Sequence, residues 1–458
     1  RIERSPPKRK AARSNRAGRA KIMLHTYLMA LQHLLFRREI SMNKNELLNY
    51  ITDHYLTSYD FNGVAIYNMP SFNTEDLVAL IQEDLVFLIT GNDDINVHIN
   101  RYNCYSDKET QIAFARKGSG FAIYPTTTHL DTLDIREEKP FTAMIARGAE
   151  QYRVLYFAVD ALELYVNNPQ YIIWDCGYRG NICVRDNATE DVLHSEFIKD
   201  FGVSYPRTGP KDRDRAIGVF LRDLSKLNFE SQCKWRAFLL RDQSEFIVNS
   251  GFVKNLLIGG WVDECWIFDA LLDEIKLINS MCKSIGLPPL FCNEYSREGN
   301  ELIGYRTLLI PSLRNFYEFV SAVEKIVVNN LNYKSFQQNA LHIKPIDRKK
   351  ADGTPKGSIE MLEEWFSVNY FASNPKGNDA FKKYIAGTFR GVRKIRQVPA
   401  HELYANEHDK ALYRKQNKLI EEVYRAVRDL RMMFGRHPLA AIVPVPDHLQ
   451  DVKNIVLY

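Results

Sequence analysis

An arginine and a histidine stand five positions apart near the C-terminal end of the chain, in the segment Arg-Gln-Val-Pro-Ala-His that begins at Arg396. The guanidinium group of Arg396 is a permanent cation whose N–H donors match the oxygens of a phosphate diester. The imidazole of His401 is the side chain best suited to accept or donate a proton near neutral pH. This pair of residues predicts cleavage of RNA without a metal ion.

The spacing of the pair is a weak signal by itself, because it should arise about once by chance in a chain of this length. Two similar pairs, Arg431 with His437 and Arg19 with His25, illustrate the point. The first lies at a predicted helix end, where basic side chains meet backbone carbonyls, and the second lies in a basic leader. We interpret both pairs as structural or incidental.

Basic residues precede the segment, and no acidic residue occurs between Asp379 and Glu402. Arg393 and Arg396 are three positions apart and share a helix face, which could follow a phosphate backbone. The alternative is a solvated basic face near a helix C-terminus, where cations are favoured. The residues predicted to contact the substrate are Arg390, Arg393, Lys394 and Gln397.

Pro399 should shape the backbone of this segment. It discourages helical geometry at Val398 and removes one backbone donor, so the helix that carries Arg396 is expected to end or kink beside it. If Pro399 starts a further helical turn, His401 lies in that turn, where the positive helix end favours a neutral imidazole that can accept a proton.

Four helices are predicted around this segment, from the recurrence of apolar residues every three or four positions. They are expected from Ser312 to about Val327, from Ser358 through Phe366, and over about 379–396 and about 409–434. Their short and medium connections suggest an antiparallel bundle over residues 305–440, with 441–458 as a C-terminal tail. The Arg/His segment falls between the third and fourth helices.

Residues 42–300 instead alternate β-rich runs with helical segments, which predicts an α+β region. The sequence YIIWDCGYRGNICVR, from Tyr171, has two β-favouring runs around a glycine-containing turn and predicts a hairpin. A helix is expected over 262–285, ended by the Gly-Leu-Pro-Pro run. The other candidate strands are FNGVAIY from Phe61, LVFLIT from Leu85, INVHINRY from Ile95 and GFAIYP from Gly120.

The charge of the chain is uneven. The 458 residues are 45% hydrophobic and carry a net charge of +5, yet residues 1–41 alone carry +9, so the remainder carries −4. A generally basic nucleic-acid-binding surface is therefore excluded, and RNA contacts require a local patch. We expect residues 1–41 to be a basic, partly disordered leader, with no membrane span, and the protein to be cytoplasmic.

The seven cysteines form no Cys-x-x-Cys pair, so neither a disulfide framework nor a zinc site is predicted. The glycine-rich nucleotide loops, the His-Glu-x-x-His motif and the Gly-x-Ser-x-Gly motif are also missing from the sequence. No cofactor and no metal are expected.

The C-terminal segment resembles the HEPN domains, a family of four-helix bundles that contains many metal-independent ribonucleases. Their signature is Arg, four to six residues, then His, and here it reads RQVPAH, followed by a long amphipathic helix. The resemblance covers residues 305–440, and Gln397 stands where many members have another polar residue, commonly Asn. It implies Arg396 and His401 as catalytic residues, RNA as substrate, 2′,3′-cyclic phosphate products, and a homodimer formed through the helical domain.

HEPN proteins often act as toxins or antiviral effectors, so the resemblance implies that residues 42–300 sense or regulate, through a ligand or partner, a nuclease used in phage defence. The alternative is a non-catalytic HEPN-like module for dimerisation or for binding a ligand or nucleic acid. A DNA-binding regulator is disfavoured, because no recognition-helix motif is found.

Overall fold

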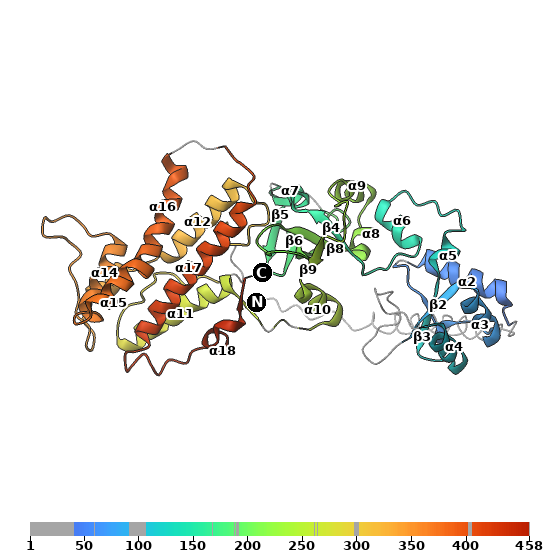
Figure 1. Ribbon diagram of the computed structural model, residues 1–458, viewed down its shortest axis with the longest axis horizontal. Coiled ribbons are helices and arrows are strands. Elements are labelled where there is room, and N and C mark those ends of the chain that lie inside the picture. Colours follow the sequence, from blue (N-terminus) through green and yellow to red (C-terminus); the bar gives the residue numbers. More distant parts are fainter. Residues whose placement is uncertain are drawn as a thin grey trace, which may run out of the picture. The chain divides into compact units, whose positions relative to one another are not determined.

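We analysed a computed structural model, which describes residues 41–458 apart from 59, 91–106, 167, 187, 189–191, 261, 263, 297–301, 402–404 and 458. Most of the expected leader and the candidate strand INVHINRY therefore lie outside the described residues. The described residues form two compact units, one of residues up to 137 together with 143–153 and the other of residues 138–142 together with those from 154 onward (Figure 1). The expected 42–300 region is thus divided between both units.

The first unit contains a three-stranded antiparallel sheet in the order β1-β3-β2. Leu47, Leu77 and Ile123 belong to its core and are fully buried. Its helix α2 starts at a capping box in which Asn43 and Glu46 bond reciprocally to backbone N–H groups. The elements are α2 (Lys44–Thr57), β1 (Val64–Ala65), η1 (Ile66–Asn68), α3 (Thr74–Gln82), β2 (Val86–Thr90), α4 (Lys108–Lys117), β3 (Phe121–Pro125), α5 (Thr127–Leu130) and α6 (Pro140–Ala146), the last of which spans the division.

Two of the predicted strands in this unit, β2 and β3, are confirmed. The run FNGVAIY was expected to be a strand throughout, but only Val64 and Ala65 pair with β3. The chain then turns into η1, where the N–H of Met69 bonds to the carbonyl of Ile66. This local hydrogen bond takes the place of sheet pairing.

The second unit begins with an antiparallel sheet in the order β4-β8-β7-β6-β5, with β9 paired to β7. The predicted hairpin is confirmed as β5 and β6, with Ile173 opposite Ile182. The elements are β4 (Val154–Ala158), η2 (Val159–Leu162), α7 (Glu163–Val166), β5 (Tyr171–Asp175), β6 (Arg179–Val184), β7 (Asp200–Pro206), β8 (Ala216–Phe220), α8 (Leu221–Ser225), α9 (Phe229–Ala237), β9 (Phe246–Val248) and α10 (Ser250–Ile258).

Long helices follow the sheet. Helix α11 packs along α17, and α12 packs along α16. These elements are β10 (Cys265–Trp266), α11 (Ile267–Ile285), α12 (Leu313–Val327), α13 (Tyr333–Gln337), α14 (Ser358–Asn369), α15 (Pro375–Phe381), the π-helical η3 (Lys382–Ala386), α16 (Gly387–His401), α17 (Ala411–Phe434), α18 (Asp447–Gln450), η4 (Val452–Asn454) and β11 (Ile455–Val456).

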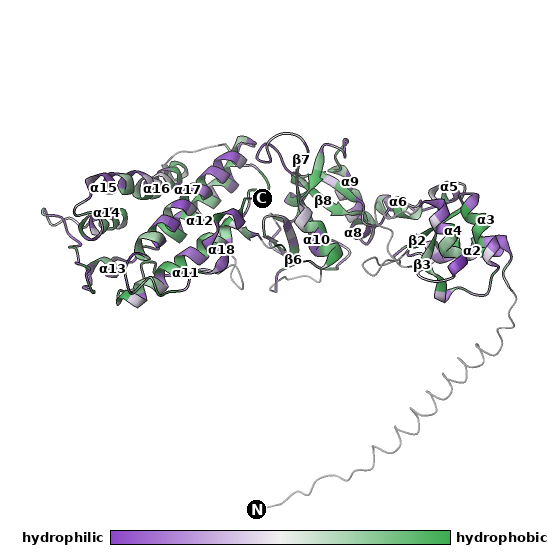
Figure 2. Ribbon diagram, turned by 60° about the horizontal axis from the view of Figure 1, so that its bottom comes forward, coloured by the Kyte–Doolittle hydropathy of each residue, from purple (hydrophilic) through white to green (hydrophobic). Residues whose placement is uncertain are grey.

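The apolar stripes predicted for this part are confirmed, since Val320 and Val323 of α12 and Val423, Val427 and Leu430 of α17 are buried. Figure 2 shows the resulting mixture of hydrophobic and hydrophilic residues along both helices. The C-terminal residues are part of this packing, because β11 pairs in parallel with β10. In the described part of the chain, no helix has both the length and the apolar character that a membrane crossing requires.

Part of one backbone expectation is wrong. The helix that carries Arg396 was expected to end or kink beside it, and it does not end there, because α16 continues through Val398 and Pro399 to His401. His401 is therefore the last residue of this helix and does not lie in the first turn of a new one. The fixed φ of proline is compatible with helical geometry, and Pro399 lies only two residues from the helix end, so few helical hydrogen bonds are affected. The helix also begins earlier than expected, since α15, η3 and α16 are continuous from Pro375.

Candidate functional site

The Arg/His segment lies in the last two turns of α16. An α-helix rotates by about 100° per residue, so positions 396 and 401 stand about 140° apart around the axis. The two positions therefore do not lie on one face of the helix. The backbone geometry of His401 is described by the structure, whereas its side chain lies outside the description.

Arg393 and Arg396 share one carboxylate, that of Glu324 on α12. The Nε atoms of the two arginines lie 3.4 and 3.3 Å from different oxygens of Glu324. The Glu324 side chain is only 7% exposed, whereas that of Arg396 is 46% exposed. A nearly buried anion thus holds one edge of each guanidinium group, while much of the Arg396 side chain stays open to solvent.

Glu324 was not identified in the sequence, although a signal was present. It stands directly after Val323 in the apolar stripe of α12, where an acidic residue is unusual because burial of an unpaired charge is costly. The arginines of α16 supply the opposite charges. Nothing in the sequence of α12 alone specifies them as partners.

The other predicted substrate-binding residues differ in their contacts. Arg390 forms an ion pair with Glu363 of α14, which gives it a role in joining two helices. Arg393 reaches Asn329 Oδ1 at 3.5 Å besides Glu324. Lys394 and Gln397 are exposed, and within the described residues Lys394 has no ion pair. Arg390, Arg393 and Arg396 thus each join α16 to a neighbouring helix through an ion pair, and all three side chains stay partly exposed.

The second Arg/His pair is structural, as expected. Arg431 donates hydrogen bonds of 2.8 and 3.2 Å to the two carboxylate oxygens of Glu274 on α11. Burial raises the pKa of the Glu274 carboxyl, and the hydrogen bonds and charge of Arg431 oppose that rise. His437 is buried and its ring lies 3.1 Å from the carbonyl of Leu341. Neither side chain of this pair is accessible to a polymer such as RNA.

A cavity of about 320 Å³ lies between the edge strand β5 and the first turns of α12. Three guanidinium groups line it, those of Arg185, Arg306 and Arg314, together with aromatic residues such as Tyr171. Arg314 is paired with Glu318 at 3.2 Å. Asp175 and Glu318 also line the cavity, so its guanidinium groups exceed its carboxylates by one. That single positive charge and the aromatic rings suit an anionic ligand with a planar part. Part of this cavity comes from residues beyond the 42–300 region in which a ligand was expected.

Comparison with known proteins gives no further guide. No family model matches the chain, and no curated protein and no solved structure matches it either.

Proposed function

We propose that this chain is a metal-independent endoribonuclease of the HEPN type, whose helical part is a four-helix bundle that forms a homodimer. The main support for the proposal is the environment of Arg396. Its guanidinium group contacts the nearly buried Glu324, yet its side chain remains 46% exposed. It lies in the last turns of a helix that ends at His401. A positioned but accessible guanidinium group suits the binding of a phosphate diester.

In the proposed reaction, His401 removes the proton from the RNA 2′-hydroxyl or protonates the departing 5′-oxygen. The 2′-oxygen forms a bond to phosphorus as the bond to the 5′-oxygen breaks. Arg396 stabilises the negative charge that grows on the phosphate. The products are a 2′,3′-cyclic phosphate and a 5′-hydroxyl group, and no step needs an oxidant or a metal.

The helix geometry supports a site built from two chains. Because positions 396 and 401 stand about 140° apart around a straight helix, one helix does not turn both toward one phosphate. Two copies of α16 around a twofold axis can present an arginine from one chain and a histidine from the other to the same phosphate. Arg393 and Lys394 are then placed to bind the neighbouring backbone.

For the biological role, we propose a cytoplasmic toxin or antiviral effector, with the residues before the helical part sensing or regulating. The cavity beside β5 is the place at which we would look for a regulatory ligand. Expression of the active chain should arrest growth, and Arg396→Ala or His401→Ala should relieve the arrest in a protein that still folds.

The alternative is a non-catalytic module for dimerisation or binding. It is favoured by the ion pairs of Arg390, Arg393 and Arg396, which are contacts within the chain that packing alone could explain. A surface or partly exposed ion pair is a common feature of helices that has no other role.

Incubation of the full chain with labelled RNA in EDTA separates the two functions. Cleavage with cyclic phosphate ends, abolished by His401→Ala and kept by the surface variant Arg425→Ala, supports the nuclease. Arg425 is a suitable control because its only ion pair among the described residues is with Glu421, one helical turn away. RNA binding that gives no cleavage, at any protein concentration at which dimers form, would favour the module.

A further inference from the structure

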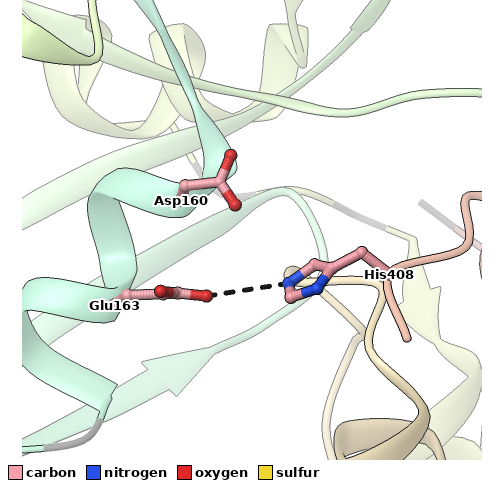
Figure 3. Close-up of side chains that lie close together, drawn as sticks. All are labelled: Asp160, Glu163 and His408. Atoms are coloured by element: carbon pink, nitrogen blue, oxygen red, sulfur yellow. Dashed lines mark ion pairs between the residues drawn. The ribbon is translucent and has the colours of Figure 1, made fainter. Parts of the chain in front are cut away.

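Three side chains that can bind metals converge in the second unit, and none of them belongs to the Arg/His segment. Asp160, Glu163 and His408 each offer one ligand atom, and these atoms lie within 4.8 Å of one another. Figure 3 shows the imidazole of His408 facing the carboxylate of Glu163, with the carboxylate of Asp160 beside them. The His408 Nε2 atom lies 3.7 Å from Glu163 Oε1. Among the residues that the structure describes, no other group of three or more such side chains meets this distance.

Local structure explains how the two carboxylates come together. Asp160 lies in η2 and Glu163 is the first residue of α7, so they are three positions apart on successive helical turns. Residues at that spacing are neighbours on a helix surface. Two adjacent carboxylates repel each other unless a cation lies between or beside them.

The backbone around His408 is fixed by residues just before and at the start of α12. The N–H of Asp409 bonds to the carbonyl of Pro311 at 2.9 Å, and the N–H of Leu313 bonds to the carbonyl of Glu407 at 3.0 Å. His408 itself forms an isolated bridge with Ser312. The imidazole is thus brought to the two carboxylates by a segment that is anchored on both sides.

We propose that Asp160, Glu163 and His408 bind a divalent transition-metal ion, with Zn²⁺ as the best match. One imidazole nitrogen and two carboxylate oxygens are ligands that Zn²⁺ accepts, and a fourth position remains for water. A neutral imidazole with two carboxylates carries a charge of −2, which balances a dication. Among the described residues no ion pair neutralises Asp160, so the negative charge of its carboxylate can balance that of a metal ion.

The distances require only a small adjustment. Ligands of tetrahedral zinc lie about 2.0–2.2 Å from the metal, so neighbouring ligand atoms are about 3.4 Å apart. The atoms here are up to 4.8 Å apart. All three side chains are exposed, so rotation about their side-chain bonds can close the difference without moving the backbone.

A second histidine pair provides the matched control. His448 Nε2 lies 3.1 Å from Asp273 Oδ2, closer than the imidazole in the proposed site is to Glu163. It has no second carboxylate at ligand distance within the described residues. If proximity of a histidine to one acid were enough, His448 would bind the metal better, whereas three ligands favour the site at His408.

The test is calorimetric titration of the full chain with ZnCl₂. To remove thiol ligands, we would change to serine Cys233 and Cys292, which are the exposed cysteines among the described residues, and Cys104, which lies outside them. We expect one site per chain. Its affinity should fall at least tenfold in His408→Ala, Asp160→Asn and Glu163→Gln, and stay within twofold in His448→Ala. Zinc should also raise the melting temperature of the parent protein but not that of His408→Ala.

The proposal would be overturned if the titration showed no stoichiometric binding of zinc. It would also be overturned if the parent protein and His408→Ala bound zinc with equal affinity. The melting temperatures of the variants without metal show whether each is folded. Because the readouts are binding and melting, they stand apart from RNA cleavage. Loss of the nuclease proposal would leave this one intact, and the reverse is also true.

Discussion

Two arginines in the helical part of the molecule, Arg396 and Arg431, have similar sequence contexts, and each pairs with a glutamate in different surroundings. Arg431 on α17 donates two hydrogen bonds to Glu274, whose side chain is fully buried, and its own side chain is 11% exposed. Arg396 on α16 makes one contact of 3.3 Å with Glu324 and is 46% exposed. Each arginine is followed within six residues by a histidine.

The difference in burial distinguishes the two arginines. Arg431 is almost enclosed by the protein, whereas Arg396 is exposed enough to contact a ligand. The donors of Arg431 are directed at Glu274 and at the carbonyl of Leu449, which leaves little for a ligand. One edge of the Arg396 guanidinium group contacts Glu324, and the group keeps N–H donors that a ligand can reach. The same residue types at nearly the same spacing therefore serve the fold in one place and, in our proposal, chemistry in the other.

The largest effect on stability is expected from Arg431→Ala. Removing the guanidinium group leaves the carboxylate of Glu274 buried without its partner, which should cost about 3–5 kcal/mol of unfolding free energy. Urea denaturation measures this, with Arg425→Ala as the surface control, for which a change below about 1 kcal/mol is expected. A loss for Arg431→Ala as small as that of the control would remove the contrast between the two pairs.

Arg396→Ala should instead have a large effect on RNA cleavage and a small effect on stability. We expect RNA cleavage to fall about 10²–10³-fold, the usual cost of losing one donor to a charged transition state. The unfolding free energy should change by less than about 1 kcal/mol, because Arg393 still pairs with Glu324 and Arg396 is half exposed. A stability loss as large as that of Arg431→Ala would instead assign Arg396 to the fold.

Glu324→Gln tests whether the shared carboxylate positions the arginine. Without the charge, the guanidinium groups of Arg393 and Arg396 are held less firmly, and we expect kcat to fall about tenfold with little change in KM. Glu363→Gln is the control, since Glu363 contacts Arg390 rather than Arg396. Equal loss of activity in both variants would point to a general effect on helix packing.

Lys394→Ala should have the smallest effect. An exposed lysine that contacts a phosphate contributes to RNA affinity without specificity, so its loss should weaken binding a few-fold. The slope of log affinity against log salt concentration should fall by about 0.7 for a single-stranded RNA. An unchanged slope would place Lys394 outside the RNA-binding surface.

The sequence predicted those features that depend on local patterns. The stripes of α12 and α17 and the β5/β6 hairpin could be predicted, because burial of one face imposes a period that can be read directly. Arg431 was expected to be structural from its place near a helix end, but its partner Glu274 lies 157 positions away and has no local signal. The extension of α16 past Pro399 was missed, since proline lowers the chance of helix without forbidding it close to a helix end.

Contacts between segments that are far apart in the chain could not be predicted from the sequence. Glu324 meets Arg393 and Arg396 because two helices pack together, and the pairing has no local signature. His408 likewise meets Asp160 and Glu163 through the fold of the second unit. Searches for clustered cysteine and histidine cannot find such a group, because its members are far apart in the chain.

In our proposal, Arg396 and His401 cleave RNA at a site built from two chains. Mixing the Arg396→Ala and His401→Ala proteins tests it most directly, because a mixed dimer retains one arginine and one histidine. We predict that each variant alone cleaves RNA at least about 10²-fold more slowly than the wild type in EDTA and that the mixture regains cleavage. Wild-type activity in either variant alone, or an inactive mixture in which subunit exchange is demonstrated, would contradict the claim.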